Sequence, residues 1–179
     1  MSELLDREAI LELLRQLGER LEVQGVQADV YVVGGTAMVL AYDRRRLTRD
    51  VDAITADQEV VERVAREMAI GREDLIPDWF NGRVRPLLPR VVDVDRIEAF
   101  TAPGISVSVA SPRHMLAMKV RAARDTRDLE DISLLCATLG VSSIAAVLAI
   151  ADDVWGPGML REESVFLVTV YLRELGFSD

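Results

Sequence analysis

The chain has 179 residues, of which 50% are hydrophobic, and its formal net charge is −9. This length supports one domain with a proper core, and two independent domains are not expected. The negative charge argues against broad, non-specific binding of nucleic acid, although it leaves room for a local basic patch. No apolar run approaches the roughly 20 residues that span a bilayer, so no membrane association is expected.

The N-terminus and the cysteine content indicate the cytoplasm. The chain begins Met-Ser-Glu-Leu-Leu-Asp, without the basic and apolar regions of a secretory signal. Its single cysteine, Cys136, lies on an apolar helical stretch and can form no internal disulfide. We therefore expect a cytoplasmic protein in which Cys136 is a buried structural thiol.

Hydrophobic periodicity and the placement of glycine and proline predict the secondary structure. The elements expected in the first part are, in chain order, a helix at 4–22, a strand at 30–33, a helix from 36 to about 42, a strand at 51–54, a helix at 57–68, a loop or lid at 72–89, and strands at 90–94 and 105–109. Trp79 and Phe80 are the expected anchor of the loop or lid. The elements expected afterwards are helices at 111–124, 126–139, 142–153 and 160–175.

This order predicts an α/β (α+β) fold, with a small mixed sheet, flanking helices and a C-terminal helical appendage. We expect a single domain over residues 1–179. Its core covers about residues 25–110, and its helical C-terminal part covers about residues 111–179.

Asp50 and Asp52 are the most informative residues of the chain. Side chains repeat every two residues along a strand, so the two carboxylates are expected to point to the same side. They are either ordinary surface acids at a strand end or ligands of a divalent cation, which neutralises such a pair. The glycine turn that precedes them favours the metal site.

That turn reads Gly34-Gly35-Thr36 and joins a strand to a helix. Two explanations are open, because the glycines could only make a tight turn and Thr36 could only cap the helix. Alternatively, the turn lets the backbone approach a phosphate closely and offers it N–H groups at a helix start. In that case the Thr36 hydroxyl and these N–H groups hold the β- and γ-phosphates of a nucleotide.

Gly34-Gly35-Thr36 followed by Asp50-x-Asp52 resembles the nucleotidyltransferase superfamily, which has the DNA polymerase β-like fold. It is most similar to a small bacterial branch that includes the toxins of AbiE-type toxin–antitoxin systems. A second block, Ser111–Ile132, resembles that branch in its Ser-Pro helix start, its lysine and its downstream Arg-Asp-x-x-Asp. The segment Pro77–Gly82 is similar to a Trp-Leu-Asn-like element between the blocks. The resemblance covers roughly residues 25–140.

The resemblance implies an enzyme that transfers a nucleoside monophosphate from an NTP to an acceptor hydroxyl. The implied cofactor is Mg²⁺ (or Mn²⁺), held by Asp50 and Asp52. The acceptor is a tRNA, a protein or a small molecule, and a toxin of this kind would have a cognate antitoxin as its partner. The alternative is a catalytically weak nucleotide-binding or antitoxin-like interaction module of the same fold.

Lys119 is the only lysine of the chain, since the other 20 of its 21 basic side chains are arginines. A compact ammonium that arginine cannot imitate is one explanation, and chance in an arginine-rich chain is the other. The resemblance implies that Lys119 contacts the nucleotide phosphates. It also implies that Asp128 is the downstream catalytic acid, although Asp128 could equally be an acid that favours a helix start. Asp128 and Asp131 are expected to share one helix face.

The basic run from Arg44 to Arg49 is either a solvated loop or a surface for phosphate or RNA. Within it, Arg46 and Arg49 are the candidates for nucleotide binding, although both are close enough to Asp50 for simple ion pairing. Many polymerase β-like enzymes also carry a third carboxylate on an adjacent strand. Asp93 and Asp95 are the candidates here, and neither lies in a recognisable signature.

Overall fold

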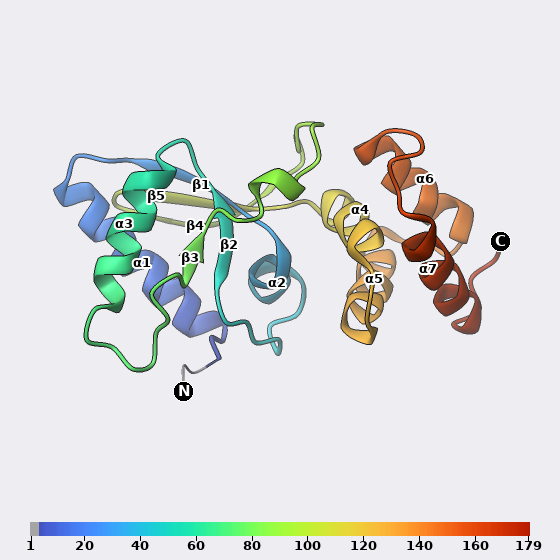
Figure 1. Ribbon diagram of the computed structural model, residues 1–179, viewed down its shortest axis with the longest axis horizontal. Helices are drawn as coiled ribbons and strands as arrows, with labels where there is room; N and C mark the ends of the chain where they lie inside the picture. Colours follow the sequence, from blue (N-terminus) through green and yellow to red (C-terminus); the bar gives the residue numbers. More distant parts are fainter. Residues whose placement is uncertain (1–3) are drawn as a thin grey trace. The chain divides into compact units, whose positions relative to one another are not determined.

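The computed structural model describes residues 4–179, and this part of the chain forms two compact units (Figure 1). The first unit comprises residues up to Leu87 together with Arg96–Ala110, and the second comprises Leu88–Asp95 together with Ser111–Asp179. The chain passes from one unit to the other between residues 87 and 88, 95 and 96, and 110 and 111.

Within residues 4–179, a five-stranded mixed sheet forms the centre of the first unit, as expected. Its strands are β1 (Ala28–Val32), β2 (Val51–Ile54), β3 (Phe80–Asn81), β4 (Ile97–Ala102) and β5 (Ile105–Val109). They lie in the order β3-β2-β1-β5-β4. Parallel pairs join β1 to β5 and β2 to β3, whereas β1–β2 and β4–β5 are antiparallel.

The helical segments of this unit are α1 (Arg7–Val23), α2 (Gly34–Ala37), the π-helical turn η1 (Met38–Tyr42), α3 (Gln58–Ala69) and the 3₁₀ turn η2 (Arg85–Leu87). The Asp6 carboxylate caps α1 by accepting a hydrogen bond from Ala9 N at 2.8 Å. The leucines of α1 recur at helical spacing, and those at 14, 17 and 21 are fully buried.

Glycine allows α1 to approach the turn between β4 and β5. A Cβ on Gly18 would lie 2.5 Å from the Pro103 carbonyl oxygen, and one on Gly104 would lie 2.0 Å from the Gly18 oxygen. Gly104 also has a φ of +73°, which side chains other than glycine rarely adopt. The helix therefore crosses the hairpin backbone to backbone.

Trp79 anchors the segment between α3 and β3, as the sequence predicts. Its ring is fully buried, its Nε1 donates to the Ala65 oxygen of α3 at 2.9 Å, and it meets the Phe80 ring edge to face. The segment is not only a loop, because Phe80 and Asn81 form β3 beside β2. A strand of two residues is too short for a periodic pattern to reveal.

The strand expected at 90–94 is absent from the described chain, and that prediction was wrong. Val92 and Val94 are 76% and 82% exposed in an irregular loop, and the edge strand is β4, which begins at Ile97. The alternation of valine with polar residues imitates a strand. However, the Asp93 carboxylate bonds to a helix start instead of lying beside a neighbouring strand.

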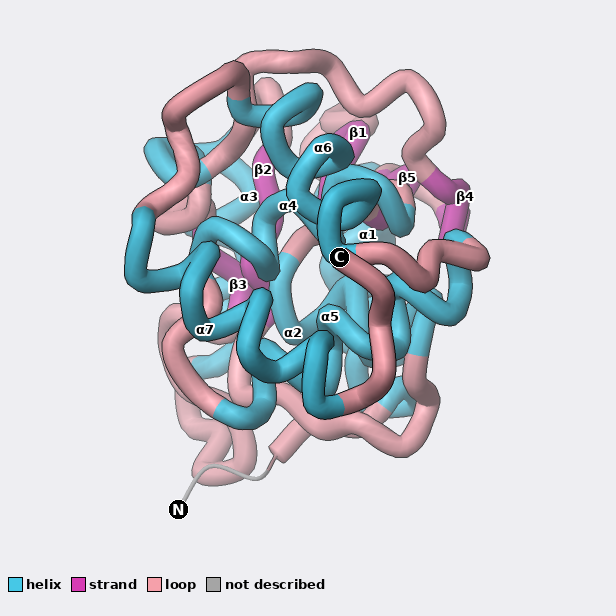
Figure 2. Tube along the Cα trace, turned by 90° about the vertical axis from the view of Figure 1, so that its right-hand side faces the viewer, coloured by secondary structure: helices cyan, strands magenta, loops and turns pink. Residues whose placement is uncertain are grey.

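The second unit contains the helices α4 (Pro112–Ala122), α5 (Thr126–Leu139), α6 (Ile144–Trp155) and α7 (Glu162–Glu174), which lie together in Figure 2. Side chains at the positions before α4, α5 and α6 accept hydrogen bonds from backbone N–H groups of the first turn. These caps, made by Ser111, Asp125 and Ser143, explain why the expected helix starts agree with the structure to within two residues.

His114 and Asp93 form a buried cluster at the start of α4. The His114 Nδ1 atom lies 3.2 Å from the Asp93 Oδ1 atom, and the two side chains are only 8% and 5% exposed. The second Asp93 oxygen accepts a hydrogen bond from Ser111 N at 2.8 Å, and His114 Nε2 lies 3.2 Å from the Val91 oxygen. The cluster thus attaches the loop at 88–95 to the first turn of α4.

Cys136 is fully buried in α5, and burial raises the pKa of its thiol to about 11. It is therefore protonated and unreactive, as expected of a structural thiol. Among residues 4–179, no helix is long and apolar enough to cross a membrane.

We expect Asp93→Ala to lower the free energy of unfolding by about 2 kcal/mol, because it leaves the Ser111 N–H without its acceptor and removes the buried contact with His114. Chemical denaturation measures this loss. The control is Asp95→Ala, which removes an exposed carboxylate two residues later and should change stability little. Equal losses in the two variants would show that the Asp93 contacts contribute nothing specific.

Candidate functional site

Asp50 and Asp52 lie on one side of β2, as the two-residue repeat predicts. Both are partly exposed, whereas Val51 and Ala53, which alternate with them, are fully buried. The strand therefore uses one face for the core and presents its two acids together on the other.

The pKa of Asp52 is raised above its usual range, first by burial and then by the negative charge of Asp50. Arg83 and a hydrogen bond from Asn81 oppose this rise. Two hard carboxylate oxygen donors that repel each other fit a divalent cation such as Mg²⁺, which would relieve the repulsion. The donor set is thus suitable for the metal that the sequence predicts.

The glycine turn lies beside the Asp52 carboxylate. Gly34 has a φ of +65°, and a Cβ at this position would lie 3.2 Å from the Asp52 Oδ2 atom. A Cβ on Gly35 would lie 3.1 Å from the Thr48 hydroxyl. Glycine therefore leaves open the space beside Asp52, and the first N–H groups of α2 lack acceptors within the helix.

Thr36 has a different place from the one expected. It is 1% exposed, it lies inside α2 instead of capping it, and its hydroxyl donates to the Asp50 backbone oxygen at 2.6 Å. The Thr48 hydroxyl donates to the same oxygen at 3.1 Å. Both threonines thus hold the backbone of Asp50. The Thr36 hydroxyl is therefore engaged within the protein and does not face a phosphate. A phosphate contact through the backbone N–H groups of the turn stays a prediction.

Sequence reasoning missed Asn81 as a site residue. It is paired with Asp52 in the register of β2 and β3, it is 5% exposed, and its Nδ2 lies 3.3 Å from the Asp50 Oδ2 atom. The resemblance of Pro77–Gly82 marked this segment but not its position. Thr48 was missed as well, although its place two residues before Asp50 could have indicated it.

Arg46 and Arg49 lie on the loop that leads into β2. The Arg46 side chain is 18% exposed and lies 3.8 Å from an Asp43 oxygen, whereas Arg49 is exposed. Their role in nucleotide binding stays a prediction.

Neither candidate for a third carboxylate belongs to the unit that carries Asp50 and Asp52. Asp93 and Asp95 are part of the second unit, where Asp93 is engaged by His114 and Asp95 is exposed. No group of three or more His, Cys, Asp or Glu side chains suited to a metal occurs in the described part of the chain. The position beside Asp52 on the neighbouring strand is occupied by Asn81.

Lys119 forms a compact ionic cluster with two acids of α5. Its Nζ atom lies 2.9 Å from an Asp128 oxygen and 2.9 Å from an Asp131 oxygen. The lysine and Asp128 side chains are about 15% exposed, and the Asp131 side chain is 3% exposed. Asp128 and Asp131 therefore share a helix face, as predicted, and both are directed at the lysine. Their catalytic and phosphate-binding roles stay predictions.

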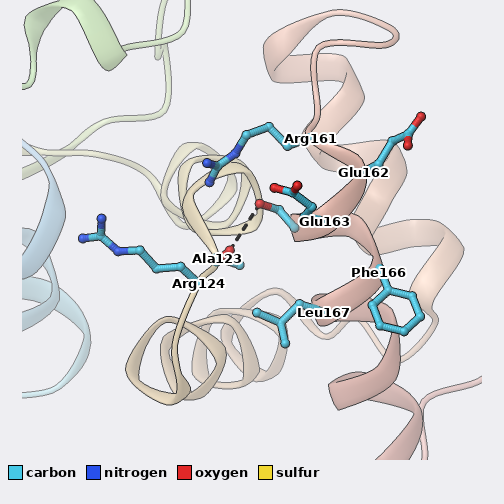
Figure 3. A pocket seen from close by; sticks show the side chains of 8 residues that line it. Ala123, Arg124, Arg161, Glu162, Glu163, Phe166 and Leu167 are labelled. Carbon is cyan, nitrogen blue, oxygen red and sulfur yellow. Dashed lines mark hydrogen bonds between the residues drawn. The ribbon is translucent and has the colours of Figure 1, made fainter.

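An open hollow of about 550 Å³ lies elsewhere in the second unit, between the link from α4 to α5 and the start of α7 (Figure 3). Its polar groups satisfy the end of α4: Ser164 Oγ donates to the Ala123 oxygen, and the Arg161 guanidinium donates to the Arg121 oxygen. None of the predicted site residues lines it, so we assign it no function.

Comparisons with known proteins identify a family and a similar fold. The profile of a family described as "Nucleotidyltransferase of unknown function (DUF6036)" matches residues 8–153. A comparison with curated proteins gives no match. Among solved structures, an antigenic nucleotidyltransferase-like protein from Paracoccidioides brasiliensis is similar in fold, with a TM-score of 0.51 and 14% identity over 97% of this chain and 91% of the other. The comparisons do not name the AbiE-type branch.

We expect Gly34→Ala to destabilise the protein more than Gly25→Ala does. Both positions have a positive φ, which costs about 1–2 kcal/mol for alanine, but a Cβ on Gly25 meets nothing within 4 Å. The additional loss at Gly34 reports the close approach to Asp52, and chemical denaturation of the two variants measures it. An equal loss of stability in the two variants would mean that the turn can shift to accommodate a Cβ and that Gly34 is not closely packed against Asp52.

Proposed function

Since the chain belongs to the DUF6036 family of nucleotidyltransferases, we propose that it transfers a nucleoside monophosphate from an NTP to an acceptor hydroxyl, with Mg²⁺ or Mn²⁺ as its cofactor. The observation that carries the proposal is the position of the positive-φ Gly34 beside the carboxylate of Asp52. A glycine turn that could approach a phosphate and two carboxylates that could bind a cation thus belong to one unit.

In the proposed reaction the acceptor oxygen attacks the α-phosphorus, the bond to the β-phosphate breaks and pyrophosphate leaves. A divalent cation bound at the site supplies positive charge that stabilises the attacking and leaving oxygens. Asp50 and Asp52 would hold this cation, and the hydroxyls of Thr36 and Thr48 fix the backbone of Asp50. Gly34 and Gly35 let the backbone N–H groups approach the triphosphate. The acceptor proton passes to solvent in this scheme.

We propose Lys119 as the cation that binds the nucleotide phosphates. An ammonium group has three N–H donors, and Asp128 and Asp131 engage it from α5 at 2.9 Å each. The two acids orient the ammonium, and we propose that Asp128 acts by holding Lys119 in this position. A third donor is then available to a phosphate oxygen.

The identity of the acceptor distinguishes a toxin that modifies tRNA from a transferase of another kind. With a net charge of −9, an RNA acceptor such as tRNA needs a local arginine surface, and we propose the run from Arg44 to Arg49, which includes Arg46 and Arg49, for this purpose. A tRNA acceptor would support an AbiE-type toxin with a cognate antitoxin. A protein or small-molecule acceptor would support a transferase of another kind.

We expect Asp50→Asn and Asp52→Asn each to abolish Mg²⁺-dependent incorporation of label from α-labelled NTPs into total RNA or protein. The fold should persist, because the substitutions relieve repulsion without changing side-chain size. Asp57→Asn, at an exposed position of the same unit, is the matched control and should retain full incorporation. Near-complete activity in either site variant would refute the two-carboxylate site. A folded parent without incorporation into any acceptor would favour the catalytically weak binding module.

We expect Lys119→Arg to lower the rate by more than about tenfold, equivalent to about 1.4 kcal/mol in the barrier. A planar guanidinium cannot occupy the same position between Asp128 and Asp131 as a compact ammonium does. Single-turnover incorporation of label measures the rate, and Lys119→Ala should be at least as damaging.

Arg113→Lys is the control for this pair of variants, because Arg113 lies on the same helix and its ion pair with Asp153 is exposed. It should leave the rate unchanged. A fully active Lys119→Arg protein would show that only the charge of Lys119 matters.

A further inference from the structure

Asn81 occupies the place on β3 that lies beside the Asp50–Asp52 pair. The register of the two parallel strands sets Asn81 opposite Asp52 and Phe80 opposite Val51. The Asn81 residue is 5% exposed, so its amide is withdrawn from bulk water and needs partners within the protein.

Backbone groups fix the orientation of this amide. Asn81 Oδ1 accepts a hydrogen bond from Arg83 N at 3.2 Å, and Asn81 Nδ2 donates to the Asp78 oxygen at 3.4 Å. A backbone N–H can only donate and a backbone carbonyl can only accept, so exchanging the amide oxygen and nitrogen would lose both bonds. The NH₂ group therefore faces Asp50, with its Nδ2 atom 3.3 Å from Asp50 Oδ2.

We propose that Asn81 is the third member of the Asp50–Asp52 site, acting as a neutral donor that positions Asp50 and not as a metal ligand. The site then offers two negative charges to a cation instead of three, so the cation binds chiefly together with the triphosphate. This inference rests on the proposed function in one respect, since it requires a divalent cation at Asp50 and Asp52.

The contact from Asn81 is compatible with metal binding by the same carboxylate. An ionised carboxylate has about four lone-pair positions, so Asp50 Oδ2 can accept from Asn81 and still ligate a cation. Affinity for a hard cation rises with the number of charged oxygen ligands. Two carboxylates alone hold it weakly, and the phosphate oxygens of an NTP supply the missing negative charge.

The test measures Mn²⁺ binding to the free protein by calorimetric titration, with and without a non-hydrolysable NTP analogue. For the parent we expect weak binding that becomes much tighter with the analogue. Asn81→Asp keeps the size of the side chain and adds a third carboxylate. It should tighten Mn²⁺ binding to the free protein by about tenfold and make the analogue matter less. Asn81→Ala removes the donor and should weaken binding by about tenfold.

A measurement of folding keeps the test decisive if Asn81→Asp is unstable. Three adjacent carboxylates repel, so its thermal midpoint in EDTA should fall below that of the parent and be restored by Mn²⁺. The matched control is Asp74→Asn, which breaks the exposed Arg72–Asp74 ion pair on the segment between α3 and β3. It should leave Mn²⁺ affinity unchanged.

The outcomes separate this inference from the proposed function. A parent that binds Mn²⁺ with the analogue, combined with unchanged affinity in both Asn81 variants, overturns the role of Asn81 alone. Tight Mn²⁺ binding to the free parent, unaffected by the analogue, overturns the two-charge site. A folded parent that binds no Mn²⁺ in either condition overturns the metal-dependent function, and the inference with it.

Discussion

Repulsion between Asp50 and Asp52 is the constraint around which the first unit is organised. A strand that must present two acids on one face cannot bury them in the core, so the alternate residues Val51 and Ala53 provide its attachment to the sheet. Burial and mutual charge raise the pKa of Asp52, which means that the folded protein holds this carboxylate at a cost in free energy. Such a cost is typical of sites where a ligand supplies the missing charge.

The surrounding contacts maintain the pair in this unfavourable arrangement. Two threonine hydroxyls hold the Asp50 backbone oxygen, and the Asn81 amide donates to the Asp50 carboxylate. Gly34 leaves the space beside Asp52 open because it has no Cβ. Each of these groups comes from a different segment of the chain, so the site depends on the whole sheet edge.

The second unit treats its buried charges in the opposite way. Lys119 is paired with two acids of α5, and Asp93 is paired with His114 and with a backbone N–H at the start of α4. Pairing of this kind gives rigidity and orientation, because a buried partner left alone would be strongly unfavourable. The first unit thus holds two acids side by side, and the second holds the Lys119 ammonium in a defined position between two acids.

The sequence by itself determined the elements with strong local signals. The Asp-x-Asp spacing was enough to predict that Asp50 and Asp52 face the same side, since that follows from strand geometry alone. The Ser-Pro pair at residues 111 and 112 similarly indicated where the first helix of the second unit begins. The motif also pointed to the nucleotidyltransferase family and its α/β fold, which the family profile and a structure of only 14% identity confirm.

Only the tertiary structure decided what lies beside those residues. The pairing of β3 with β2 places Asn81 next to Asp52, but a two-residue strand has no period that a pattern could reveal. The valines at 91–94 alternate as a strand would, yet that segment finds no strand to pair with and Asp93 binds His114 instead. The sequence does not indicate which acceptor the Thr36 hydroxyl uses. The acceptor is the Asp50 backbone oxygen, which is 14 residues away along the chain and is brought close by the packing of α2 against β2. Local patterns fix which residues share a face, whereas neighbours distant in sequence are fixed by strand pairing and by the burial of polar groups that must find partners.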